Sequence, residues 1–325
     1  MGIHMSINVS NLYLILFHQV KGIGIKKLKE IYKKFGDFQK AYNAPLEDFE
    51  KIIKEKKVIT NVQKFLNQKE DVVKKVKQIN ILLKNREVRY VSYFDNDYPK
   101  PLLEIEDPPV GLYIKGDYLF EYLEKSVSII GTRDPSFYGH SKARTIAREL
   151  AEQGYTIVSG LARGIDMEAH LGALEGGGNT IAVLGSGVEN IYPEEHKNLA
   201  KDILDNGGAL ISELDVNQRS SPHSLVSRNR IVSGLSKASL IIEGTLKSGT
   251  RHEANFARTQ NKYLFALRPL SLSREISELP LDLIENGAIG IETTSDIIDF
   301  INSSIIRDES KKKTKKDLMD FIRIE

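Results

Sequence analysis

The segments SIIGTR at residues 128–133, VSGLARGID at 158–166, AVLGSG at 182–187 and LKSGT at 246–250 each place a Gly- or Ser-bearing turn after apolar residues. Helix-like stretches follow these turns, and this alternation is typical of an α/β fold with a parallel sheet. In such a sheet the strand ends and the helix N-termini meet along one edge, where free backbone N–H groups bind anions. The sequence therefore predicts phosphate binding there. The candidate residues in these turns are Gly131, Thr132, Arg133, Ser159, Gly160, Arg163, Gly164, Asp166, Gly185, Ser186, Gly187, Ser248, Gly249 and Thr250.

The composition bounds the class of protein. The chain has 325 residues, of which 41% are apolar, so it can bury a full core and is expected to form two or more domains. We find no apolar run near the roughly 18 residues of a membrane span, and no membrane partner is expected. The absence of cysteine excludes disulfides and thiolate metal sites and fits a cytoplasmic protein. The histidines are too scattered for metal spacing, so neither a metal nor another cofactor is predicted.

Charge is distributed unevenly along the chain. Residues 1–107 hold 20 Lys and Arg against 14 Asp and Glu, whereas residues 108–306 hold 19 against 25. A polyanion site in the second segment must therefore be local, built from a few arginines and backbone amides.

The organisation predicted from periodicity has three parts. Apolar residues recur every three or four positions between residues 11 and 85, which indicates a helical domain over residues 6–84. A proline-containing connector precedes a Rossmann-like domain over residues 85–306. A lysine-rich tail follows at residues 307–325, where a solvated end is favoured over a specific site.

The N-terminal region contains a short hairpin motif, VKGIGIKKL at residues 20–28. Gly22 and Gly24 would let the backbone approach a nucleic-acid phosphate, while Lys26 and Lys27 supply positive charge. A plain turn between two packed helices, or a protein contact, explains the same residues. Both interpretations stay open.

Two groups in the second half point to anion contacts. Asp166 is expected to cap a helix, and Arg163 to form a fork on a phosphate. Arg228, Asn229 and Arg230 stand at the start of another predicted helix and indicate at least one phosphate contact, although one arginine could instead hold a carboxylate. The chain lacks both the dinucleotide fingerprint and a P-loop, so those two nucleotide sites are not supported.

The order of these blocks resembles the DprA/Smf (DNA-processing protein A) family. The resemblance extends from about residue 12 to 301 and includes DYP at 97–99, DPPVGLYIKGD at 107–117, IYP at 191–193 and RNR at 228–230. It implies a sterile-alpha-motif-like helical domain followed by an extended Rossmann domain. The implied function is binding of single-stranded DNA by a homodimer, which protects incoming DNA and loads the RecA recombinase in natural transformation, competence and recombination. It implies no enzymatic activity.

One departure from the family pattern supplies an alternative. Glu253 stands where the family usually has threonine, and GTRHE at residues 249–253 resembles a block of the nucleotide-cleaving "Lonely Guy" enzymes. This second resemblance implies a protein that binds or hydrolyses a nucleoside monophosphate. Under it, Glu253 would act in the phosphate pocket.

Overall fold

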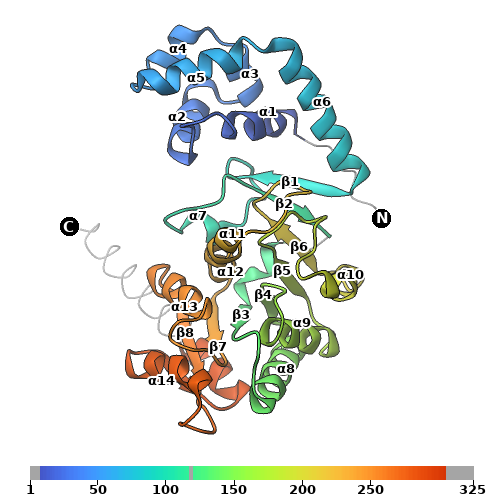
Figure 1. The fold of residues 1–325 in the computed structure, drawn as a ribbon, viewed down its shortest axis with the longest axis vertical. Helices are drawn as coiled ribbons and strands as arrows, with labels where there is room; N and C mark the ends of the chain where they lie inside the picture. The colour runs from blue at the N-terminus through green and yellow to red at the C-terminus, as the bar shows by residue number, and fades with distance from the viewer. Residues whose placement is uncertain (1–7, 117–119, 305–325) are drawn as a thin grey trace, which may run out of the picture.

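The computed structural model describes residues 8–116 and 120–304 and, within these ranges, all side chains except those of residues 121 and 122. The N-terminal helices form a unit that sits on one end of a larger α/β part (Figure 1). The predicted α/β class, with a mostly parallel sheet and a helical N-terminal region, is confirmed. No helix of the described ranges is long and apolar enough to cross a membrane.

Six helices make up the N-terminal unit. They are α1 (Val9–His18), α2 (Ile25–Phe35), α3 (Phe38–Tyr42), α4 (Leu46–Glu50), α5 (Lys56–Leu66) and α6 (Lys69–Asn85). Local signals set their ends: Gly36 closes α2 with a left-handed conformation, and the Asp37 side chain accepts a hydrogen bond from the backbone of Lys40 to begin α3. Phe17, Phe38 and Phe49 fill the centre of the unit.

A nine-stranded sheet forms the centre of the second part. Its strands are β1 (Val88–Ser92), β2 (Gly111–Lys115), β3 (Ser126–Ile130), β4 (Thr156–Ser159), β5 (Thr180–Val183), β6 (Ala209–Ser212), β7 (Ala238–Ile241), β8 (Tyr263–Leu267) and β9 (Ile289–Ile291). The order is β1-β2-β6-β5-β4-β3-β7-β8-β9. Strands β3 to β9 pair in parallel, while β2 is antiparallel to both β1 and β6.

Helices cover both faces of the sheet. The remaining helices are α7 (Lys100–Leu103), α8 (Phe137–Glu152), α9 (Ile165–Glu175), α10 (Lys197–Asp205), α11 (Pro222–Ser227), α12 (Asn229–Leu235), α13 (Thr250–Thr259), α14 (Glu278–Glu285) and a helix over residues 294–304, with 3-10 turns at Phe120–Glu124, Glu194–His196 and Glu275–Ser277. One apolar cluster joins the sheet to α8, α9 and the helix over 294–304, and another joins it to α7, α12, α13 and α14. Because both faces are covered, the central strands β3 to β7 are fully buried, including the serines and threonines that they carry.

The strand order reverses beside β3. Its sequence neighbour β4 pairs on one side, and β7 pairs on the other side. The turns after β3 and β7 therefore lead to helices on opposite faces, which leaves a crevice at the carboxyl ends of the strands. All four predicted turns lie at this edge of the sheet.

The helical unit and the sheet share one apolar cluster. Phe94, in the turn after β1, stacks on Tyr32 with 4.5 Å between ring centroids and contacts Phe38 at 5.1 Å. The Asn11 amide donates to Asp95 at 2.6 Å. The helices end at Asn85 and the first strand begins at Val88, close to the predicted boundary at residue 84, but the division into domains stays a prediction. The tail predicted at 307–325 lies outside the described residues.

Candidate functional site

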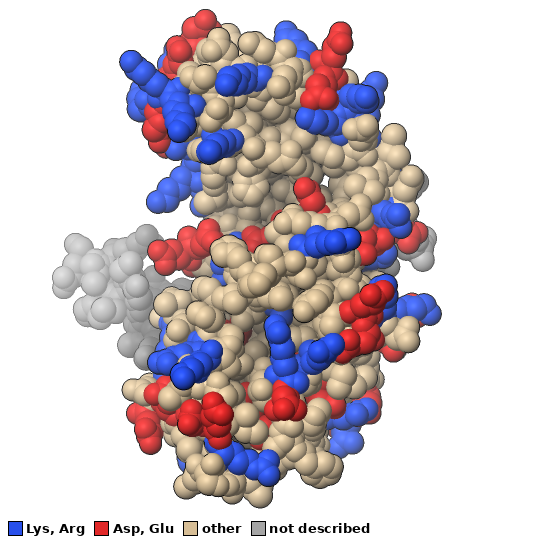
Figure 2. All heavy atoms as spheres, viewed as in Figure 1, with Lys and Arg blue, Asp and Glu red and all other residues tan. Residues whose placement is uncertain are grey.

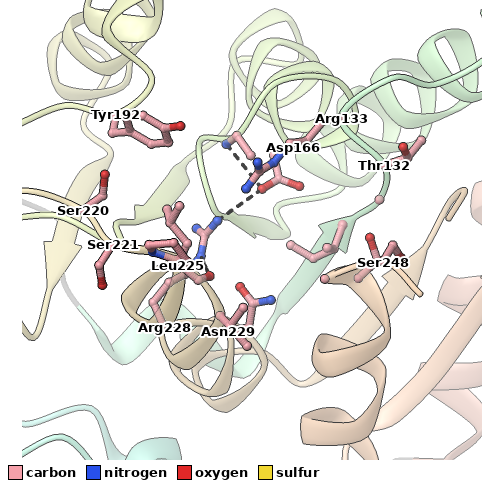
Figure 3. A pocket seen from close by; sticks show the side chains of 17 residues that line it. Thr132, Arg133, Asp166, Tyr192, Ser220, Ser221, Leu225, Arg228, Asn229 and Ser248 are labelled. Carbon is pink, nitrogen blue, oxygen red and sulfur yellow. Dashed lines mark hydrogen bonds and ion pairs between the residues drawn. The ribbon is translucent and has the colours of Figure 1, made fainter. Parts of the chain in front are cut away.

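The crevice beside β3 holds a cavity of about 700 Å³. Figure 3 shows its lining residues, which come from the turn after β3, the start of α9, the loop before α11, the junction of α11 and α12, and the start of α13. The lining consists of Ile130, Gly131, Thr132, Arg133, Ala162, Asp166, Tyr192, Ser220, Ser221, Pro222, Leu225, Val226, Arg228, Asn229, Ser248, Gly249 and Thr250. Nine of the predicted site residues are among them.

Arg228 forms part of the cavity floor and is only 5% exposed. Its guanidinium donates to the carbonyl of Val183, and its Nη2 lies 3.7 Å from Oδ2 of Asp166. Burial lowers the pKa of Arg228 and Asp166 opposes that shift, but an arginine stays protonated in a protein. The floor therefore carries a fixed cation that is paired with the Asp166 carboxylate at 3.7 Å.

Asp166 is the second residue of α9 rather than its N-cap. The N-cap is Gly164, and no side chain caps this helix, so the predicted capping role of Asp166 is wrong. Its carboxylate instead faces Arg228 and accepts a hydrogen bond from the backbone of Ala162 at 3.4 Å. Burial raises the pKa of Asp166, while Arg228 lowers it. The carboxylate is thus part of the floor.

The opposite side of the cavity is the N-terminus of α13. Among the described residues, the backbone N–H groups of Gly249 and Thr250 have no hydrogen-bond acceptor. Unfilled N–H groups at the start of a helix carry partial positive charge and favour an anion. The geometry therefore supports the predicted anion site at these two residues.

Arg133 supplies the exposed cation of the mouth. It lines the cavity and forms no ion pair with any residue in 8–116 or 120–304. In the same turn, the backbone N–H of Thr132 donates to the backbone carbonyl of Glu243 at 2.8 Å. This bond fixes the turn against the end of β7. The Arg133 side chain is thus available to a ligand while its backbone is held.

At two of the predicted glycines, neighbouring protein atoms occupy the space that a side chain would need. A Cβ on Gly160 would lie 1.7 Å from a guanidinium nitrogen of Arg228, and a Cβ on Gly164 would lie 2.4 Å from the carbonyl oxygen of Thr132. Gly164 also has a φ of 72°, which disfavours side chains. Gly160 lines only a smaller side pocket next to the main cavity, and Ser159 donates to the carbonyl of Ile129 within the sheet.

Other predicted residues lie away from the main cavity. Arg163 makes a two-bond ion pair with Glu195, with one contact at 2.8 Å, and lines the side pocket. Arg230 is held by two hydrogen bonds to Glu213, at 2.7 and 2.6 Å, and by Asp107. The turn of Gly185, Ser186 and Gly187 packs against the segment over residues 215–225, which includes the start of α11. The N-terminal candidates Gly22, Gly24, Lys26 and Lys27 lie in the helical unit, where Lys27 pairs with Glu55 at 2.7 Å.

The other eight lining residues were not predicted as site residues. They are Ile130, Ala162, Tyr192, Ser220, Ser221, Pro222, Leu225 and Val226. Tyr192 is 47% exposed, and its ring lies across the mouth from Arg133 in Figure 3. Ser221 begins α11 with a capping box and Pro222 takes its first position. The Ser-Pro pair is typical of the start of a helix, but no residue near it in the sequence indicates that this helix lines the cavity.

Glu253 does not line the cavity. It is fully buried in α13, where its Oε1 lies 3.5 Å from the Ser128 hydroxyl and its Oε2 has no hydrogen-bond partner among the described residues. Burial raises the pKa of Glu253 well above its usual value, and the nearby Arg228 only partly opposes this. The side chain is therefore a buried acid with a raised pKa, and it lies behind the floor.

Replacement of Glu253 with glutamine should change how stability depends on pH. A raised pKa in the folded state means that the acid favours folding below its unfolded value of 4.5, and that this stability is lost as pH rises through the folded pKa. Glutamine stays neutral at every pH. We expect the melting temperature of the variant to rise relative to that of the parent between pH 4.5 and pH 8. A constant difference in melting temperature over this range would contradict the assignment.

The histidines of the region are structural. His170 is fully buried, its Nδ1 lies 2.7 Å from the Thr180 hydroxyl, and burial lowers its pKa to about 3. The Nδ1 of His196 lies 2.8 Å from the carbonyl of Leu161. The described ranges contain no cluster of His, Asp and Glu that could hold a metal ion.

Three comparisons with known proteins bear on this chain. Protein Smf of Escherichia coli is 40% identical over 202 residues, which are 62% of this chain and 54% of that protein. The X-ray structure of DNA processing protein A from Streptococcus pneumoniae superposes with a TM-score of 0.71 and 27% identity, covering 89% of this chain and 97% of that one. A Helicobacter pylori DNA processing protein A, whose structure describes its single-stranded DNA binding mode, superposes with a TM-score of 0.59 and 33% identity, covering 66% and 96%.

The family model described as DNA recombination-mediator protein A matches residues 89–302. This range contains the whole cavity lining and all the strands except the start of β1. It leaves the six N-terminal helices outside the match, so the family assignment rests on the part that holds the cavity. The chain belongs to the DNA recombination-mediator protein A family, also called DprA/Smf.

Proposed function

We propose that this protein binds single-stranded DNA through backbone phosphates at the cavity and serves DNA processing during transformation or recombination. The observation that carries the proposal is the cavity itself, which combines the exposed Arg133, the buried Arg228 and the open N-terminus of α13. Each of these features favours an anion. The related Helicobacter pylori protein is described as binding single-stranded DNA, which supports the same ligand here.

The charges around the site favour local phosphate contacts over a broad basic surface. Figure 2 shows basic and acidic side chains next to one another over the α/β part, with no large field of one sign. Arg163 and Arg230 are already paired with carboxylates. A few placed cations bind a phosphate without reading the bases, so we expect little dependence on base order.

The hydrolase alternative gains no support from the position of Glu253. A general acid or base must lie within hydrogen-bond reach of the reacting atoms, and this carboxyl is buried outside the cavity lining. We therefore propose a binding protein rather than an enzyme. The family resemblance alone carries the further proposals of a homodimer and of a RecA-type recombinase as partner.

A DNA titration at several salt concentrations tests the function. We expect a labelled oligo-dT to bind tightly at low salt and to lose affinity steeply as salt rises, because phosphate binding releases counterions. Arg133→Ala should weaken binding by about 1.5–3 kcal/mol and reduce the salt slope by about 0.7. Fluorescence anisotropy measures both quantities.

A matched arginine variant separates the cavity from general charge. Arg163→Ala also removes one cation, but that cation is paired with Glu195 outside the main cavity, so we expect a much smaller change in affinity. Equal losses in the two variants would indicate nonspecific attraction. Failure of the parent to bind DNA at low salt would overturn the proposed function.

A further inference from the structure

The cavity has polar groups at two depths. Arg133 is exposed at the mouth, whereas Asp166, Arg228 and Asn229 on the floor are 3%, 5% and 8% exposed. A ligand group that reaches the floor replaces water as the hydrogen-bond partner of these polar side chains. Contacts at the floor therefore discriminate among ligands more strongly than contacts at the mouth.

Asn229 is the clearest sign of an unfilled site. Its side-chain amide points into the cavity in Figure 3, and it makes no hydrogen bond to any residue that the structure describes. The residue as a whole is buried, but its amide atoms are not enclosed by protein and are open to the cavity. An amide on a cavity floor without a protein partner is therefore arranged for a bound group.

Arg228 adds unused donors to the same floor. Nη1 donates to the Val183 carbonyl and Nε to the Leu225 carbonyl at 3.4 Å, but Nη2 lies 3.7 Å from Asp166, beyond hydrogen-bond length. The free N–H groups of Gly249 and Thr250 face the same cavity from the other side. An anion with several oxygens could accept from both sides at once.

The shape of a DNA strand limits which phosphate can reach this floor. An internal phosphodiester has a sugar on each side, so both sugars would have to enter the cavity with it. A phosphate monoester has one sugar and presents three free oxygens, with a charge of about −1.5 to −2 at neutral pH. The monoester matches a floor that offers donors from two sides.

Resting on the proposed function, we propose that the floor around Asn229 and Arg228 is a site for a nucleotide phosphate monoester, carried by the end of a single strand or by a free mononucleotide. Arg133 at the mouth then contacts the internal phosphates of a bound strand. Asp166 and Arg228 hold the shape of the floor. The protein would thus prefer DNA with phosphorylated ends.

Three pairs of ligands test the site and show whether the monoester comes from a strand end or from a free nucleotide. A 3′-labelled oligo-dT with a 5′-phosphate should bind at least about tenfold more tightly than the same oligonucleotide with a 5′-hydroxyl. Unlabelled competitors with a 3′-phosphate or a 3′-hydroxyl test the other end. Thymidine monophosphate and thymidine, as competitors, test the free nucleotide.

Variants connect the preference to the floor. Asn229→Ala should bring the phosphorylated and hydroxyl ends to equal affinity, and Asn229→Asp, which keeps the shape and adds negative charge, should do the same if the alanine variant does not fold. Arg133→Ala should lower the affinity for both oligonucleotides by the same factor, so that the ratio of the two affinities does not change. The assignment would be overturned if the preference for the phosphorylated end disappeared in Arg133→Ala but remained in the Asn229 variants.

The outcomes distinguish this inference from the proposed function. A preference for phosphorylated ends assigns the monoester to the strand end, and competition by thymidine monophosphate alone assigns it to the free nucleotide. Equal binding of all ends without such competition overturns the inference and leaves DNA binding intact. Absence of binding by every oligonucleotide at low salt overturns the proposed function itself.

Discussion

Replacement of Arg228 with alanine is expected to lower the free energy of unfolding by about 3–5 kcal/mol, because the change leaves the buried Asp166 without its cation. It also leaves the Val183 carbonyl without its donor and opens space beside Gly160. Urea denaturation measures the loss. DNA affinity, measured well below the melting temperature, should fall as well, since the floor loses its positive charge.

Arg230→Ala is the matched control for Arg228. Arg230 is also largely buried and paired, with Glu213 and Asp107, but it does not line the cavity. We expect this variant to lose stability while keeping the DNA affinity of the parent when folded. If Arg228→Ala loses stability alone, the floor cation is structural and contributes nothing to binding.

Replacement of Gly164 with alanine should lower the free energy of unfolding by about 2–6 kcal/mol, from backbone strain of about 1–3 and steric overlap of about 1–3. The strain arises from its φ of 72°, and the overlap from the Thr132 carbonyl oxygen 2.4 Å from the new Cβ. Relief of the overlap must move the turn that carries Arg133. We therefore expect weaker DNA binding together with a lower denaturation midpoint.

Gly177→Ala separates the two contributions. Gly177 has a φ of 65°, but no atom lies within 4 Å of the position that an alanine Cβ would take, so only backbone strain of about 1–2 kcal/mol is expected. This residue follows α9 at the opposite end from the cavity. A loss at Gly177 equal to that at Gly164 would show that the contact with Thr132 is unimportant.

The fold could be predicted because its signals are local. The apolar runs that became β3 and β5, and the turns that follow them, are legible without tertiary information. The reversal of strand order beside β3 was not, since it depends on where β7 pairs after a separation of more than 100 residues. The crevice could be expected at the strand ends, but its walls could not be assigned.

The roles of individual side chains were harder to predict than the site. Arg163, Arg228 and Arg230 have the same chemistry in the sequence, yet one lies on the cavity floor and the other two pair with carboxylates outside the main cavity. The partners Glu195 and Glu213 are brought near by the fold alone. Glu253 was expected in the phosphate pocket from the resemblance to the "Lonely Guy" block, but the structure buries it in α13 behind the cavity lining.

The antiparallel edge of the sheet has a consequence for synthesis on the ribosome. Strand β2 pairs with β1, and its other neighbour β6 is about 90 residues further along the chain, which takes roughly 5–20 s to translate. Until β6 has been synthesised, the β1–β2 pair that lies next to Phe94 and the six N-terminal helices has no further strand beside it. During that time the helical unit is supported by the β1–β2 pair and by its own ring contacts, such as those of Phe17 with Phe49 and Phe65.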